Sequence, residues 1–178
     1  ATLTIQAPTA FISPELDGRV THFYEWQGAG FFNPRQRGGA MHQTSGFVEE
    51  VYFGFDLDHF YFRTRLHPSL DQLLQSGHRL ELHLSGPGRF LMRIEQPDCY
   101  DLLEWKDDRW RFVEKRDTLK SDRIVEGAVP WAALGAKPGE KWGFFLQVLK
   151  QKVVLESCPE QKNIPIEVPD PDFEAKLW

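Results

Sequence analysis

The amino-acid sequence predicts an all-β protein, a two-sheet antiparallel β-sandwich of jelly-roll-like type with one or two short helices. Three observations favour this fold class. Short segments rich in β-branched and aromatic residues recur along the chain, with turn residues between them. Several of these segments alternate apolar and polar residues, as strands with one buried face do. Aromatic residues make up 13% of the 178 residues, and their rings can fill the space between two sheets.

Ten segments are expected to be strands, and they lie at residues 3–5, 20–26, 47–55, 59–66, 79–85, 90–94, 110–114, 124–129, 143–149 and 152–156. The first is short and alternating, and the second is rich in β-branched and aromatic types. Segments 47–55 and 59–66 are separated by Asp56-Leu-Asp58, a turn signal, so this pair is expected to form a β-hairpin.

Alternation also assigns faces to the next strands. In 79–85 we expect Leu80, Leu82 and Leu84 to point inward and Glu81 and His83 to point outward. A Gly-Pro-Gly turn then leads into 90–94, and the later strands are short runs between further turn residues.

Helical content is expected to be slight. Residues 68–76 can form a short helix, with proline at its start and Gly77 after its end, and residues 130–134 can form a single turn closed by Gly135. The tail, 165–178, is expected to be extended as far as Asp172 or Phe173. Its apolar end is expected to pack onto the body of the domain or onto a neighbouring domain.

The net charge of −5 argues against a nucleic-acid partner, since such binding depends on clustered Lys and Arg. No apolar run approaches the roughly 20 residues of a membrane span. The first residues show neither the basic nor the apolar region of a signal peptide. We therefore expect no membrane partner and a cytoplasmic location.

Cys99 and Cys158 match no metal or redox spacing, and we expect two reduced thiols, with a disulfide as the alternative.

Two stretches of the chain resemble known families. The first comprises Ile12–Gly18, Tyr24–Gly30, Gly39–His42 and Val51–Asp56. In this order they are similar to the region C-terminal to the catalytic domain in glycoside hydrolase family 57 proteins, which act on α-glucans. The second comprises Glu126–Leu134 and Pro138–Gly143. It resembles the late part of the sandwich shared by family 9 carbohydrate-binding modules and other DOMON-like domains.

These resemblances imply a single accessory domain, residues 1–178, excised from the C-terminal part of a larger protein. The implied partners are an oligo- or polysaccharide, an α-glucan, and the catalytic domain of the same polypeptide. Family 9 modules clamp a sugar between two tryptophans, and no pair in this chain aligns with that clamp. The catalytic machinery of family 57 lies in a separate domain, so we expect no enzymatic activity here.

Exposed aromatic rings are the natural platforms for the apolar face of a sugar. Trp105 and Trp110 lie in a polar setting that predicts a hairpin tip, whereas Trp131 and Trp142 are expected to be core residues. The glycine-rich segment 25–35 has two interpretations: a sugar-contacting or domain-docking surface, or an irregular crossover whose polar groups bind local backbone. The remaining candidate carbohydrate-binding residues come from this region: Tyr24, Glu25, Trp26, Gln27, Asn33 and His42.

No set of catalytic residues is expected. Glu49 and Glu50 are neighbours on one strand and point to opposite faces, which does not suit a glycosidase pair. The pairs Asp56/Asp58 and Asp107/Asp108 are explained by turns. A calcium ion could use Asp56 or Asp58, but no ligand-loop pattern is present, and we expect no metal and no cofactor.

Three functions remain open. The first is a carbohydrate-binding module. The second is a structural domain that packs against the catalytic domain without touching free sugar, which predicts an exposed apolar patch near Phe31, Phe32 or Trp178. The third is an independent enzyme, which hydrolysis of a glycoside by the isolated chain would establish.

Overall fold

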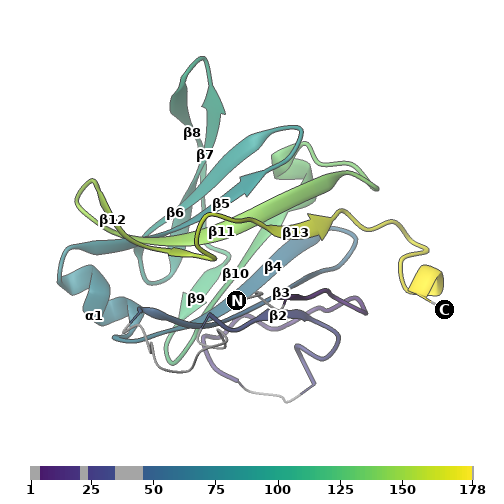
Figure 1. The fold of residues 1–178 in the computed structure, drawn as a ribbon, viewed down its shortest axis with the longest axis horizontal. Coiled ribbons are helices and arrows are strands. Elements are labelled where there is room, and N and C mark those ends of the chain that lie inside the picture. Colours follow the sequence, from purple (N-terminus) through teal and green to yellow (C-terminus); the bar gives the residue numbers. More distant parts are fainter. Residues whose placement is uncertain (1–4, 21–23, 35–45, 178) are drawn as a thin grey trace.

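The alternating segments form two antiparallel sheets packed face to face, which confirms the predicted β-sandwich (Figure 1). This computed structural model describes residues 5–20, 24–34 and 46–177. One sheet contains, in spatial order, β1 (Ile5–Gln6), β2 (Gly30–Phe32), β3 (Val48–Phe55), β4 (His59–Leu66), β10 (Val125–Pro130) and β9 (Leu119–Ser121). We call it sheet A.

The second sheet, sheet B, contains in spatial order β12 (Val153–Cys158), β11 (Lys141–Lys150), β5 (His78–Ser85), β6 (Arg89–Gln96), β7 (Cys99–Lys106) and β8 (Arg109–Arg116). A further strand, β13 (Ile164–Glu167), pairs with the first part of β11. The helices are short: α1 (Leu70–Gln75), η1 (Trp131–Leu134) and η2 (Ala175–Leu177). Among the described residues, no helix combines the length and apolarity needed to cross a membrane.

The core lies between the sheets, where the predicted inward residues meet. Leu80, Leu82 and Leu84 are buried on sheet B, as their alternation predicts. The Phe144 ring of β11 packs edge-on against two rings of sheet A, at centroid distances of 5.2 Å to Phe53 and 5.1 Å to Phe60. Such aromatic pairs join the two sheets by apolar burial and favourable ring geometry.

Several local predictions are confirmed. The hairpin of β3 and β4 pairs Phe55 with Phe60 around the Asp56–Asp58 turn. Helix α1 begins after Ser69, which forms a capping box with Gln72. Trp131 and Trp142 are buried, as expected of core residues. The two cysteines are separate thiols, one on β7 and one on β12.

The strand predicted at residues 20–26 is wrong, and the structure contains strands that the sequence analysis did not predict. Residues 24–26 lie in a turn, not in a strand, and residues 21–23 are outside the described part of the chain. Gly28 closes this turn with a φ of +89°, and a side chain there would collide with Ala10. Four strands were not expected: β2, β7, β9 and β13. The last contains Pro165, which argues against a central strand but is tolerated at this sheet edge.

One hydrogen bond crosses the core between the sheets. Tyr100 of β7 is buried, and its hydroxyl donates to the Ala128 carbonyl of β10 at 2.7 Å. Strand β9 pairs only with Val125–Gly127, so the Ala128 carbonyl lies beyond that ladder and also accepts from Thr118 Oγ1 at 2.7 Å. Burial raises the pKa of Tyr100 to about 12, which keeps the hydroxyl protonated as a donor.

The two sheets differ in how far they extend. Strands β7 and β8 form a hairpin that projects at the top of Figure 1. No residue of β8 is buried, and its side chains on the core side are polar: Arg109, Arg111, Glu114 and Arg116. Sheet A therefore does not cover β8. Bulges interrupt both β8 and β12, and β1 and β9 are very short, so these four edge strands are blunted against pairing with another chain.

Replacing Tyr100 by Phe tests the inter-sheet hydrogen bond. We expect the free energy of unfolding, measured by urea titration, to fall by about 1 kcal/mol, because a buried hydrogen bond is lost without a large change in volume. Tyr24, whose side chain is 72% exposed, offers the matched control, and Tyr24→Phe should change stability by less than about 0.5 kcal/mol. Equal effects of the two substitutions would show that the Tyr100 bond does not stabilise the sandwich.

Candidate functional site

The outer face of sheet B, which points away from the core, carries an unexpected row of apolar and aromatic side chains. The strand register places Phe145, His83, Leu91, Leu103 and Phe112 side by side across β11, β5, β6, β7 and β8. Outward residues of a sandwich are usually polar. The two leucines are nevertheless only 4% and 5% exposed, so other side chains cover them on this outer face.

Four rings form a continuous strip over this row. His83 stacks parallel to Phe145, with centroids 4.7 Å apart, and the Trp110 ring meets His83 edge-on at 5.8 Å. Trp105 lies opposite Trp110 in the β7–β8 hairpin, at 5.3 Å. We call Phe145, His83, Trp110 and Trp105 the aromatic strip. Because Trp110 reaches His83 from three strands away, the hairpin must curl over the outer face of the sheet.

An open pocket adjoins the Phe145 end of the strip. Its volume is about 410 Å³, within the range of small-molecule sites. The pocket is lined by residues of β11, β12 and the loop between β12 and β13: Phe145, Gln147, Ser157, Pro159, Glu160, Gln161, Lys162 and Asn163. Gln147 Nε2 donates to Ser157 Oγ at 3.1 Å, so these two polar groups are held in place beside the Phe145 ring. The pocket thus offers hydrogen-bonding groups next to an apolar platform.

A buried carboxylate fixes the centre of the strip. Glu81 is buried on the outer face, with its Oε1 3.0 Å from His83 Nε2 and its Oε2 accepting from Arg79 Nε at 2.8 Å. Burial disfavours the charge of Glu81, but the contacts with His83 and Arg79 outweigh it and lower the pKa. The ionised Glu81 therefore holds the His83 ring parallel to Phe145.

The structure brings together only two of the sequence-predicted site residues, Trp105 and Trp110, which lie at a hairpin as expected. Tyr24, Glu25, Trp26 and Gln27 lie in a turn of the N-terminal segment, on the side of sheet A. Asn33 is half-buried just after β2, and His42 lies outside the described residues. The five of these residues that the structure describes therefore do not form one site with the two tryptophans.

Within that turn, Trp26 and Glu25 have structural contacts. Trp26 is only 7% exposed and packs with Ile12, Tyr61 and Ala128 on the outer face of sheet A, so its ring offers no open platform to a sugar. Glu25 Oε1 accepts from the Glu15 backbone N–H at 3.3 Å. This contact matches the interpretation of segment 25–35 as an irregular crossover with local backbone contacts.

Trp26 is held by a buried carboxylate. Glu126 of β10 accepts from Trp26 Nε1 at 3.1 Å and from the Gly18 backbone N–H at 3.0 Å. Burial raises the pKa of Glu126 to about 7, against the opposing effect of its N–H donors. Glu126 therefore fastens the N-terminal segment over the outer face of sheet A, which leaves the outer face of sheet B as the more open of the two.

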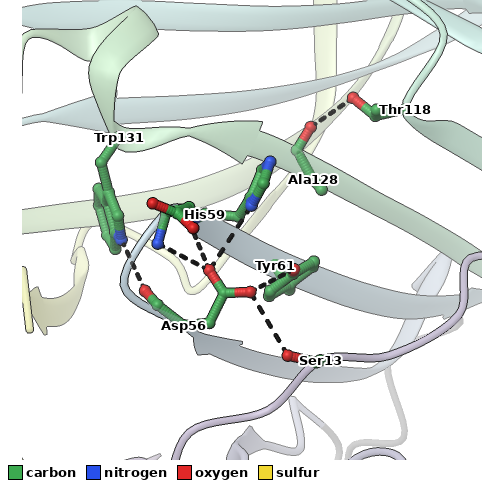
Figure 2. A network of polar contacts seen from close by, with 8 residues as sticks. Ser13, Asp56, His59, Tyr61, Thr118, Ala128 and Trp131 are labelled. Carbon is green, nitrogen blue, oxygen red and sulfur yellow. Dashed lines mark hydrogen bonds and ion pairs between the residues drawn. The ribbon is translucent and has the colours of Figure 1, made fainter.

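The carboxylate of Asp56, the calcium candidate, also accepts hydrogen bonds from groups of the protein (Figure 2). Its Oδ1 accepts from the backbone N–H groups of Asp58 and His59 at 2.8 and 2.7 Å, and its Oδ2 accepts from Tyr61 Oη at 2.7 Å. These hydrogen bonds outweigh the effect of burial and lower the pKa of Asp56. In addition, Trp131 Nε1 donates to the Asp56 carbonyl at 3.2 Å. This network joins the β3–β4 turn to η1.

Across residues 5–20, 24–34 and 46–177, no three His, Cys, Asp or Glu side chains form a group suited to a metal.

Sequence reasoning did not identify the other members of the site, Phe145, His83 and the pocket residues. The alternation of 79–85 did place His83 on the outer face. Phe145, however, lies in an almost wholly apolar strand, where alternation does not separate the two faces. Only the register between β11 and β5 reveals that the two rings meet.

Comparison with known proteins gives no match: neither a family model, nor a curated protein, nor a solved structure is similar to this chain at a significant level. The family 57 and family 9 resemblances therefore remain predictions from the sequence.

Glu126 predicts a pH dependence of stability. Its pKa of about 7 in the folded protein lies above the ordinary value of 4.5, so folding favours the protonated form. This contribution is complete below about pH 4.5 and is lost as the pH rises through about 7. Between pH 4 and pH 8 the wild type should lose about 3 kcal/mol of unfolding free energy relative to Glu126→Gln, which does not titrate. Parallel stability–pH curves for the two proteins would contradict this assignment.

Proposed function

We propose that this chain is a non-catalytic carbohydrate-binding-type module that binds an oligosaccharide along the aromatic strip. We further propose that it serves a family 57-like glycoside hydrolase acting on α-glucans. The observation that carries the binding role is the continuous contact of four half-buried rings on the outer face of sheet B, ending at a pocket with polar groups. The link to family 57 rests on the sequence resemblance alone.

The chemistry of the strip suits a sugar. A pyranose ring presents C–H groups on its faces and hydroxyls around its edge, so it needs a flat apolar surface with hydrogen-bonding groups beside it. The rings of Phe145 and Trp110 supply the surface. Gln147, Ser157 and Asn163 supply amide and hydroxyl groups at the pocket. Because the strip crosses several strands, it fits an extended oligosaccharide better than a single sugar.

A second function, packing against a catalytic domain of the same polypeptide, has one observation in its favour. Phe112 and Val113 on the edge strand β8 are 60% and 44% exposed, next to the strip. The patch expected near Phe31 and Phe32 is not formed, because Phe32 is buried and Phe31 packs against Tyr52 at 4.7 Å. Trp178 lies outside the described residues. An apolar edge beside the strip could contact a neighbouring domain while the strip itself binds sugar.

Titration with maltooligosaccharides tests the proposed function. We expect a saturable change in tryptophan fluorescence, since Trp105 and Trp110 lie in the strip, and a corresponding heat of binding by calorimetry. Trp110→Ala and Phe145→Ala should each weaken binding by about tenfold or more, as truncation of central aromatic anchors does. Thermal melting of each variant checks that it is folded.

Tyr24→Ala is the matched control, since it removes an exposed aromatic ring on the opposite side of the sandwich. Its affinity should equal that of the wild type. Loss of binding in Tyr24→Ala with full binding in Trp110→Ala would move the site to the N-terminal segment. Absence of any saturable binding by the wild type would contradict the carbohydrate-binding role and favour the packing role.

A further inference from the structure

Arg89 lies at the tryptophan end of the strip, at the start of β6. Its guanidinium carbon is 4.7 Å from the centroid of the Trp105 ring and 5.2 Å from that of Trp110. Arg89 is exposed, and it forms no ion pair with any described residue. We propose that the strip binds a glycan bearing an anionic substituent, a phosphate ester or a carboxylate, which Arg89 recognises. This inference rests on the proposed function and specifies its ligand class.

The charge of Arg89 is unusual for this face of the sheet. Arg79 and Arg93, which also point outward, each lie beside a carboxylate, at 2.8 Å from Glu81 and 3.0 Å from Glu95. Glu81, the buried carboxylate of the strip, is already occupied by Arg79 and His83. Arg89 is therefore a positive charge on the outer face that no described carboxylate compensates by an ion pair, and it lies against the two tryptophans.

The position of Arg89 prepares it to bind an anion. An arginine stacked on aromatic rings keeps its N–H groups in the guanidinium plane, where they remain available to an oxyanion. Phosphate and carboxylate accept two such hydrogen bonds at once. Contact with two indole rings also restricts the Arg89 side chain before the ligand arrives, which lowers the entropic cost of binding.

The guanidinium also favours an anionic group at this end of the strip. The hydroxyls of a neutral sugar placed over the tryptophans can accept hydrogen bonds from the guanidinium, but they do not compensate its charge. An anionic substituent at the same place would replace that water with two charge-assisted hydrogen bonds. The sugar rings would then lie toward Phe145 and the pocket, and the anionic group would lie toward Arg89.

Binding measurements with four probes at low ionic strength test this inference. The probes are a neutral maltooligosaccharide, the same oligosaccharide carrying a phosphate monoester, an oligosaccharide of uronic acids, and inorganic phosphate. We expect at least one of the anionic oligosaccharides to bind about tenfold more tightly than the neutral one, with the advantage shrinking as salt is added. The two anionic oligosaccharides distinguish phosphate from carboxylate recognition. Inorganic phosphate alone should bind far more weakly, because it makes no contact with the rings.

Arg89→Gln should abolish the preference for the anionic oligosaccharide and retain binding of the neutral one. Arg109→Gln is the matched control, because Arg109 lies on the β7–β8 hairpin that carries Trp105 and Trp110 but alternates to the face opposite Trp110. This variant should keep the preference. Equal affinities of the wild type for neutral and anionic oligosaccharides, or a preference that survives Arg89→Gln, would overturn the inference and leave the proposed function intact. Failure of every oligosaccharide to bind would overturn both. Inorganic phosphate binding as tightly as the phosphorylated oligosaccharide would reduce the site to a simple anion site and overturn the inference.

Discussion

The antiparallel register of sheet B is the constraint on which the rest of the structure depends. Side chains alternate between the two faces of a strand, so one register decides both the core and the outer surface. The register that buries Leu82 and Phe144 between the sheets also places His83 beside Phe145 on the outside. A slip of one residue in β5 would bury His83 and expose the leucines. Stability and the candidate binding surface are therefore determined by the same pairing.

The two outer faces of the sandwich differ because the described N-terminal segment packs on the outer face of sheet A. Ile12 and Trp26 pack on the outer face of sheet A, where Glu126 holds them through hydrogen bonds. On the outer face of sheet B, Leu91 and Leu103 lie in the row that pairs with His83 and Phe112. The β7–β8 hairpin extends past sheet A and curls over this face, which gives the strip its Trp105 and Trp110 rings. The difference in cover between the sheets thus explains why the candidate site lies on sheet B.

Local patterns in the sequence were enough to predict the sandwich, the hairpin around Asp56, and helix α1 with its turn at Gly77. The predictions failed where a residue is buried by a segment that lies far away in the sequence. Tyr24–Trp26 has strand-like composition but forms a turn, because Trp26 is drawn to the distant Glu126. Strand β7 was not predicted because it mixes polar and apolar residues. Its outer end lies beyond the part of sheet B that sheet A covers. For the same reason only half of the strip was predictable. Trp105 and Trp110 are neighbours in one hairpin, whereas their contact with His83 and Phe145 depends on the pairing of three further strands, β6, β5 and β11.

The central claim, that an oligosaccharide binds across the outer face of sheet B, can be tested most directly by nuclear magnetic resonance. Backbone and aromatic signals of the labelled chain would be followed during titration with a maltooligosaccharide. The account predicts that the largest shifts belong to Phe145, His83, Trp105 and Trp110 and to the pocket residues, with those of Tyr24–Gln27 unchanged. Shifts confined to the N-terminal segment, or none at saturating sugar, would contradict it.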